Sequence, residues 1–192
     1  MKKVTIIMAV FISAISFSQS REKGTIELTP LIGYASSTYS GENVENNETV
    51  SSVSFGVNAD YYFNDRWSLR SSILSQKMGS QFSGYKEELA YITIPLNANW
   101  HFGSTRKWNL NFGPSIGFLM SAKANGIDVK KYANPTQIGL SYGIGYKIEV
   151  TEDFGILIDF QGMSGLTKVA KDAEVDIFNA HSVFNIGAVL KL

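Results

Sequence analysis

The sequence predicts an all-β protein, specifically a transmembrane, antiparallel, up-and-down β-barrel of about eight strands. Three observations lead to this prediction. The chain starts with a segment typical of an export signal, apolar and polar residues alternate from residue 24 to the C-terminus, and short turns alternate with longer polar connections. Alternation with a period of two is the pattern of strands that have one apolar and one polar face. Short turns at one end and longer loops at the other are typical of membrane barrels.

The N-terminal segment has the layout of a cleaved signal peptide. Two lysines are followed by an apolar region, residues 4–15, and then by small residues at the two positions that a signal peptidase recognises before Gln19. An apolar region of twelve residues is shorter than the roughly 20 residues that a membrane-spanning helix needs. We therefore expect residues 1–18 to be removed and residues 19–192 to form the barrel.

Charge and cysteine content exclude several classes of protein. The 17 basic residues balance the 17 acidic ones, and a nucleic-acid partner, which requires a concentrated basic face, is not expected. The chain has no cysteine. A disulfide framework, a thiolate metal site and lipid attachment through an N-terminal cysteine are therefore excluded.

The alternating pattern occupies eight stretches of the chain. In the clearest one, apolar residues from Ala90 to Phe102 alternate with a mostly polar set. We expect one strand in each stretch, namely residues 26–34, 53–63, 67–77, 90–102, 108–120, 137–148, 154–166 and 181–192. Pro95 and Pro114 fall inside two of these strands. Because proline cannot donate a hydrogen bond to a neighbouring strand, we expect a bulge or a local break at each.

Two features favour a membrane barrel over a soluble, lipocalin-like carrier, which remains the alternative. The polar faces carry mainly Gly, Ser and Asn, which suit a narrow packed interior. The connections are also unequal: three predicted turns are short, at residues 64–66, 103–107 and 151–153, and four predicted loops are longer, at residues 36–52, 79–87, 122–135 and 168–180. Aromatic residues cluster beside the short turns, as in the interfacial girdle of a membrane barrel. We therefore expect the protein to lie in the lipid bilayer of the outer membrane.

Two short motifs resemble those of a known family. Residues 91–96 contain Ile-Pro-Leu, and residues 112–118 contain Gly-Pro-Ser-Ile-Gly. These stretches, together with the overall layout, resemble the PorT-type outer-membrane β-barrel family, which typically carries an I-P-L strand followed by a G-P-x-x-G strand. The resemblance implies the barrel fold over most of the chain. It also implies a role like that of family members involved in secretion across the outer membrane, but no residue here matches a known functional site of that family.

Charged residues on the polar faces are the candidate site. They are Glu27, Asp60, Arg70, Lys147, Glu149, Asp159 and Lys191. The interior of an eight-stranded barrel is only wide enough for side chains. We expect these charges to pair with one another in a structural plug that keeps the barrel closed. A gated channel or a proton path is the alternative.

The short turn at residues 64–66 predicts the register of its hairpin. A turn centred on Asp65 sets Asp60 opposite Arg70 inside the barrel, because an even pairing keeps both polar faces on the same side. Closure of the last strand on the first likewise brings Lys191 near Glu27. We therefore predict one ion pair between Asp60 and Arg70 and a second between Glu27 and Lys191.

No set of residues predicts catalysis, a cofactor or a firm metal site. His101 and His181 lack the spacing of metal ligands, and neither has a catalytic partner in the sequence, so a structural role is expected. The acidic loop that contains Glu42, Glu45 and Glu48 could bind calcium, although such loops are more often simply solvated.

We therefore expect a non-enzymatic outer-membrane barrel with a filled lumen and a structural or interaction role, accessory to secretion or adhesion through an envelope protein partner. Two alternatives remain open at this point. The first is a lipid-modifying barrel enzyme, and the second is a small-solute channel.

Overall fold

The computed structural model describes residues 21–41, 44, 47–171 and 175–192. The predicted signal peptide, residues 1–18, lies outside the described residues, as do Glu42 and Glu45 of the acidic loop. None of the helices in the described part of the chain is long and apolar enough to cross a membrane.

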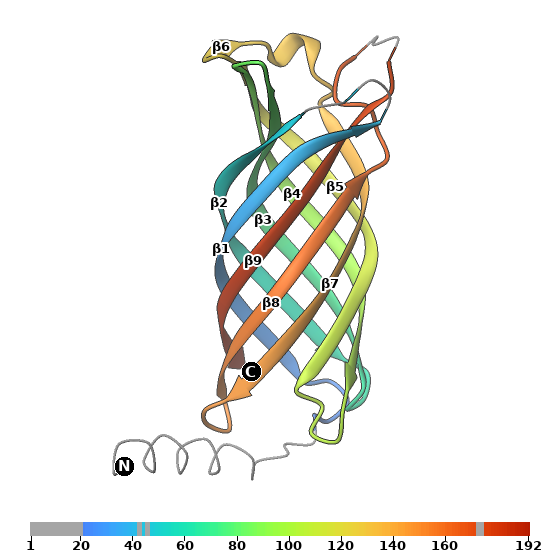
Figure 1. Cartoon of the computed structure of the whole chain (residues 1–192). Helices are drawn as coiled ribbons and strands as arrows, with labels where there is room; N and C mark the ends of the chain where they lie inside the picture. Colours follow the sequence, from blue (N-terminus) through green and yellow to red (C-terminus); the bar gives the residue numbers. More distant parts are fainter. Residues whose placement is uncertain (1–20, 42–43, 45–46, 172–174) are drawn as a thin grey trace, which may run out of the picture.

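Eight antiparallel strands close into a barrel (Figure 1). The strand order is β4-β3-β2-β1-β9-β8-β7-β5, and pairing of β4 with β5 closes the sheet, while the short strand β6 is added to β5 at the end of the barrel opposite the C-terminus. The elements are β1 (Ile26–Gly41), β2 (Glu48–Tyr62), β3 (Trp67–Phe82), β4 (Tyr85–Phe102), β5 (Trp108–Ala124), β6 (Ile127–Asp128), the 3-10 helix η1 (Lys130–Tyr132), β7 (Thr136–Glu149), β8 (Phe154–Gly165) and β9 (Ile177–Lys191). The up-and-down barrel predicted from the alternating pattern is confirmed.

The two faces of the wall are assigned as in a membrane protein. On the outer face, large apolar side chains are exposed, for example Ile73 at 63%. On the inner face, polar side chains are buried, for example Asn99 at 0%. A soluble barrel would bury the apolar face and expose the polar one. The arrangement therefore fits a wall surrounded by lipid, and the alternative of a lipocalin-like soluble carrier is wrong.

Short turns occur at the end of the barrel that carries the C-terminus (Figure 1). As predicted, residues 63–66, 103–107 and 150–153 connect consecutive strands there. We assign this end to the periplasm, because membrane barrels place their short turns on that side. The opposite, outer end carries β6 and the longer connections.

At the outer end, the strands are longer than the sequence pattern predicted. The predicted loop at residues 79–87 is wrong, because β3 and β4 continue to a two-residue turn at Ser83 and Gly84 with φ of 46° and 81°. Asn125 and Gly126 make a second such turn, with φ of 47° and 83°, inside the predicted loop at residues 122–135. Two consecutive residues with positive φ form the turn that matches the twist of a hairpin, and Asn-Gly is its strongest sequence signal.

The prolines interrupt the hydrogen-bonded ladder without changing the register. Pairing of β3 with β4 is broken between Ser71–Leu96 and Leu74–Thr93, next to Pro95. Pairing of β4 with β5 is broken between Pro95–Ser115 and Ala98–Phe112, next to Pro114. Of the two outcomes expected, a bulge or a local break, each proline therefore shows the local break. Register shifts in the described strands lie elsewhere, after Thr49 in β2 and after Ala90 in β4.

A row of aromatic rings follows the outer wall near the periplasmic turns. Successive ring centroids are 4.8–6.3 Å apart along the row, which consists of Trp67, Trp100, Phe102, Trp108 and Tyr146. Amphipathic rings prefer the level of the lipid headgroups, and this row has the composition and position of an interfacial girdle.

Candidate functional site: the closed interior of the barrel

The interior is the candidate site, because strand alternation directs almost all buried polar side chains into it. It has three levels. A charged plug lies at the periplasmic end, a central charge cluster lies in the middle, and an apolar cap lies at the outer end.

The central cluster is built on the hairpin of β2 and β3. Asp60 lies opposite Arg70 in the register that the short turn predicted. Arg70 Nε donates a hydrogen bond to Asp60 Oδ2 at 2.9 Å. Its Nη1 lies 3.6 Å from Asp159 Oδ2, on β8 across the lumen. One guanidinium group therefore bridges two buried carboxylates.

Uncharged side chains donate further hydrogen bonds to both carboxylates. Ser68 Oγ and Asn99 Nδ2 each donate to Asp60 Oδ1 at 2.8 Å. Asn185 Nδ2 donates to Asp159 Oδ1 at 2.8 Å, and Gln161 Nε2 donates to Asp159 Oδ2 at 3.0 Å. Buried charges need such partners because burial removes them from bulk water. The small amide and hydroxyl residues that mark the inner face in the sequence have this role.

The charged plug closes the periplasmic mouth around Glu27. The Glu27 carboxylate accepts hydrogen bonds from Tyr62 Oη at 2.9 Å and Arg21 Nε at 3.3 Å. It also forms a close ion pair with Lys147, which reaches across the lumen from β7. Glu27 and Lys191 are register partners, as predicted. The predicted ion pair between them is nevertheless wrong: among the described residues, the ion-pair partners of Glu27 are Lys147 and Arg21.

The reason lies in the position of Lys191 at the end of β9. Its side chain is partly exposed at the barrel mouth, where water can solvate the ammonium group. Glu27 is buried deeper and is reached more closely by cations from the opposite wall and from the chain before β1. The register position opposite Glu27 was therefore not sufficient for Lys191 to form an ion pair with it.

Arg21 was missed by the sequence reasoning, yet it is central to the plug. It is only 4% exposed, its Nη1 donates to the carbonyl oxygen of Arg106 at 2.9 Å, and its Nη2 lies 3.4 Å from Glu149 Oε1. Its guanidinium also lies over the Tyr62 ring, 5.2 Å from the centroid. Burial lowers the pKa of Arg21, but the attraction of Tyr62 and of the two carboxylates outweighs it, so the pKa is raised above its ordinary value.

A second missed residue, Lys107, balances the charges. Its Nζ lies 3.8 Å from Glu149 Oε2. The charges that meet in the lumen are therefore four basic residues, Arg21, Arg70, Lys107 and Lys147, and four acidic ones, Glu27, Asp60, Glu149 and Asp159. Arg21 precedes the first strand and Lys107 lies in a turn. The alternation of polar residues along strands could not reveal them for that reason. The one available signal is that the predicted set has four acidic but only three basic residues.

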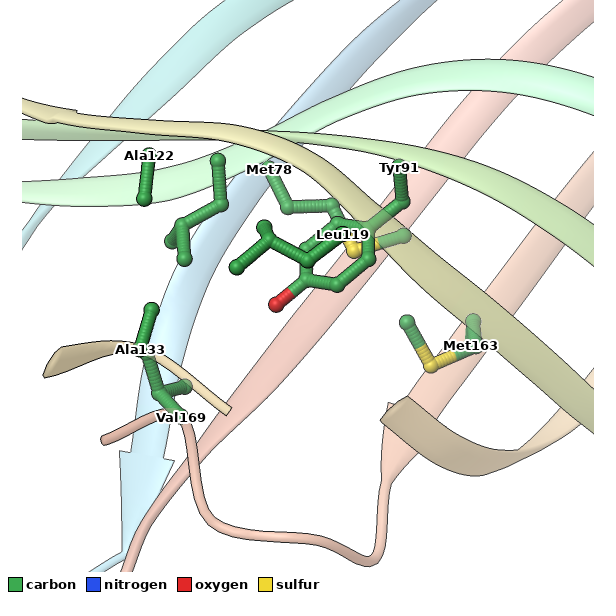
Figure 2. Close-up of a cluster of buried hydrophobic side chains, with 8 residues drawn as sticks. Met78, Tyr91, Leu119, Ala122, Ala133, Met163 and Val169 are labelled. Atoms are coloured by element: carbon green, nitrogen blue, oxygen red, sulfur yellow. The ribbon is translucent and has the colours of Figure 1, made fainter. Parts of the chain in front are cut away.

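The apolar cap closes the outer end of the lumen (Figure 2). It is a cluster of buried side chains from strands and outer loops: Met78, Leu89, Tyr91, Leu119, Ala122, Ala133, Met163 and Val169. Two loop segments fold inward to reach it, held together by an antiparallel bridge between Ala133 and Ala170 and by a 2.8 Å hydrogen bond from Asn134 N to the Val169 carbonyl oxygen. The outer mouth is therefore covered by packed side chains.

A small polar cavity separates the central cluster from the cap. Its volume is about 40 Å³, enough for a few water molecules. His181 lines it, and neither ring nitrogen of His181 has a hydrogen-bond partner among the described residues. His101 lies lower, where Nε2 contacts Ser68 Oγ at 3.0 Å and the ring packs on Tyr62. No group of three or more His, Asp or Glu residues suited to a metal ion occurs in the described ranges.

Comparisons with known proteins agree with this architecture. No curated protein matches the chain. Among solved structures, it is similar to Neisserial surface protein A (16% identity, TM-score 0.56, covering 88% of this chain and 99% of that one). It is also similar to OprG of Pseudomonas aeruginosa (12% identity, TM-score 0.58, covering 90% and 97%) and to the N-terminal β-barrel domain of OprF from the same organism (15% identity, TM-score 0.53, covering 91% and 100%). At these identities the likeness establishes the fold alone. The family model described as "Outer membrane protein beta-barrel domain" matches residues 17–171. The chain therefore belongs to this family of outer-membrane β-barrel proteins and is located in the outer membrane.

Proposed function

We propose that the protein is a closed, non-enzymatic outer-membrane barrel that acts through its outer face as a structural or interaction protein, accessory to a secretion or adhesion system. The observation that carries this proposal is the closure of the lumen at both ends. The charged plug fills the periplasmic mouth, and the apolar cap covers the outer mouth. A barrel whose interior is filled with paired side chains is a rigid support for what it presents outside.

The charge network keeps the barrel closed in this proposal. Each carboxylate of the network is matched by a cation on another strand or on a connecting segment, so the ion pairs tie opposite walls together. With signal-peptide cleavage after residue 18, Arg21 becomes the third residue of the mature chain. The plug would then be completed by the mature N-terminus itself.

The outer end offers a surface for an envelope protein partner. Large apolar side chains are exposed there, beyond the membrane-facing part of the wall, for example Phe82 at 51%, Ile127 at 71% and Tyr132 at 61%. Apolar side chains that project into water often mark interaction sites. The Ile-Pro-Leu and Gly-Pro-Ser-Ile-Gly motifs support the assignment of this chain to the PorT type within the family. This assignment is in line with an accessory role in secretion.

Neither alternative function is favoured by the arrangement of the interior. The contact between Ser68 and His101 lies inside the wall, and the carboxylate of Asp60 contacts the serine and not the histidine. A histidine that activates a serine needs the acid on its own second nitrogen. The plug and the cap also oppose a small-solute channel.

A pull-down from native outer membranes after cross-linking tests the proposal. We expect a specific envelope protein to be recovered with the unaltered barrel and to be lost with Ile127→Asp, which places a charge on the outer surface. Val150→Asp is the matched control, because Val150 is an exposed valine in a periplasmic turn. In planar bilayers, we expect no steady conductance. Stable conductance steps, or recovery of no specific protein, would contradict the proposal.

A further inference from the structure

A pocket of about 230 Å³ lies at the outer end, above the apolar cap. It is enclosed by the ends of β4 and β5 on one side and by the loop segments at residues 129–133 and 169–170 on the other. Its floor is formed by four side chains that are at most 8% exposed, Leu89, Ala122, Ala133 and Val169. They belong to the apolar cap (Figure 2). The cap therefore closes the lumen below and lines the pocket above.

Two tyrosines form the upper walls of the pocket. Tyr85 and Tyr132 are 50% and 61% exposed, so their rings border the pocket while remaining in contact with water. The ammonium group of Lys131 lies over the Tyr132 ring, 4.6 Å from its centroid. The faces of tyrosine rings attract cations, and this ring already accommodates one from the chain itself.

One carboxylate is placed on the pocket side of the wall. Glu87 alternates with Tyr85 and Leu89 along β4, so all three side chains lie on the inner face of that strand. Tyr39 donates a hydrogen bond from its hydroxyl group to Glu87 Oε2 at 2.6 Å and fixes the carboxylate in place. No described residue makes a hydrogen bond to Glu87 Oε1, which remains available to a ligand.

The neighbouring charges do not neutralise Glu87. Lys86 and Glu88 lie on the opposite face of β4 and pair with each other at 3.1 Å. Lys123 borders the pocket, but its register partners are Glu88 on β4 and Asp128 on β6, so it lies on that same outer face. Of the two charged residues that border the pocket, Glu87 and Lys123, Glu87 is therefore the one on the inner face of the wall.

We propose that this pocket binds a small organic cation, a molecule with a compact apolar body and one ammonium group. The apolar body would occupy the floor of the pocket, and the ammonium group would lie between the Glu87 carboxylate and the tyrosine rings. Binding pockets for small molecules are usually apolar and contain a few polar groups that orient the ligand. This inference goes beyond the proposed function, because it needs neither a protein partner nor an open lumen.

Three probes of similar size distinguish the contribution of the ligand's charge to affinity from the contribution of its apolar body. They are phenethylamine, which is cationic, 2-phenylethanol, which is neutral, and 3-phenylpropionate, which is anionic. Calorimetric titration of the full barrel in lipid nanodiscs, corrected with empty nanodiscs, measures their affinities. We expect phenethylamine to bind at least about tenfold more tightly than the other two, the factor expected for one favourable charge contact.

Two variants then locate the binding. Glu87→Gln keeps the shape of the pocket and should weaken phenethylamine binding by about tenfold, the same factor as the lost charge contact. Glu88→Gln, one residue along on the opposite face, is the matched control and should leave the affinity unchanged. Heat-modified migration on gels verifies that both variants are folded. The proposal is overturned if phenethylamine does not bind above the empty-nanodisc signal, if the three probes bind equally, or if the two variants lose affinity to the same extent.

Discussion

The two ends of the lumen are closed by opposite kinds of chemistry. At the periplasmic end, Glu27 is held by directional contacts with Arg21 and Lys147. At the outer end, apolar side chains such as Leu89 and Val169 close the mouth by packing against one another. In the charged region, each group depends on its partners, because a buried charge that loses its counter-ion is left unsolvated. In the cap, each side chain contributes mainly its own buried area, and the remaining side chains can adjust.

The central cluster should show this dependence most strongly. Arg70→Met removes the cation that bridges Asp60 and Asp159 while keeping similar bulk. We expect a loss of about 3–5 kcal/mol in the free energy of unfolding, because two carboxylates are left buried without a counter-ion. Urea unfolding in lipid vesicles measures this change.

Removal of the carboxylates should reverse the loss. We expect Asp60→Asn in the Arg70→Met background to recover part of the lost stability. Addition of Asp159→Asn to this double variant should recover more, because Arg70 contacts both acids. Purely additive effects of the three substitutions would show that these side chains are not coupled in the folded barrel.

A substitution in the apolar cap should lower the free energy of unfolding less than Arg70→Met does. Leu89→Ala deletes a side chain that is 3% exposed in the cap. We expect a loss of about 2–3 kcal/mol, the lower part of the range for a buried leucine, because the loop segments above can settle into the space. The same urea titration measures it. A loss larger than that of Arg70→Met would contradict the contrast between the two regions.

Lys191→Ala should have the smallest effect. Lys191 is a register partner of Glu27, but the ion-pair partners of Glu27 among the described residues are Lys147 and Arg21. We expect the free energy of unfolding to change by less than about 0.5 kcal/mol, as is usual for a surface substitution. Lys147→Ala is the informative comparison, since it removes a contact with Glu27. Equal losses in the two variants would show that Lys191 belongs to the plug after all.

The local features of this barrel were determined by the sequence itself. The period of two assigned residues such as Asn97 and Asn99 to the interior, and the turn at residues 64–66 set Asp60 opposite Arg70. Both inferences depend on neighbours within one strand or one hairpin, where backbone geometry permits few arrangements. The Asn-Gly pair at residues 125–126 was present in the sequence as well, although the polar residues around it suggested a longer loop.

The contacts across the lumen were decided only by the tertiary structure. Lys147 lies 120 residues from Glu27 along the chain, and Ala133 and Val169 come from separate connections that fold back over the outer mouth. Contacts between such distant residues depend on the number of strands, on the stagger between them and on the resulting diameter of the closed barrel. None of these quantities is encoded in the alternation of any one strand. The sequence thus determined which strand residues line the lumen and which of them meet within one hairpin, as Asp60 and Arg70 do. Closure of the barrel determined the pairs that form across the lumen and brought in Arg21 and Lys107 from outside the strands.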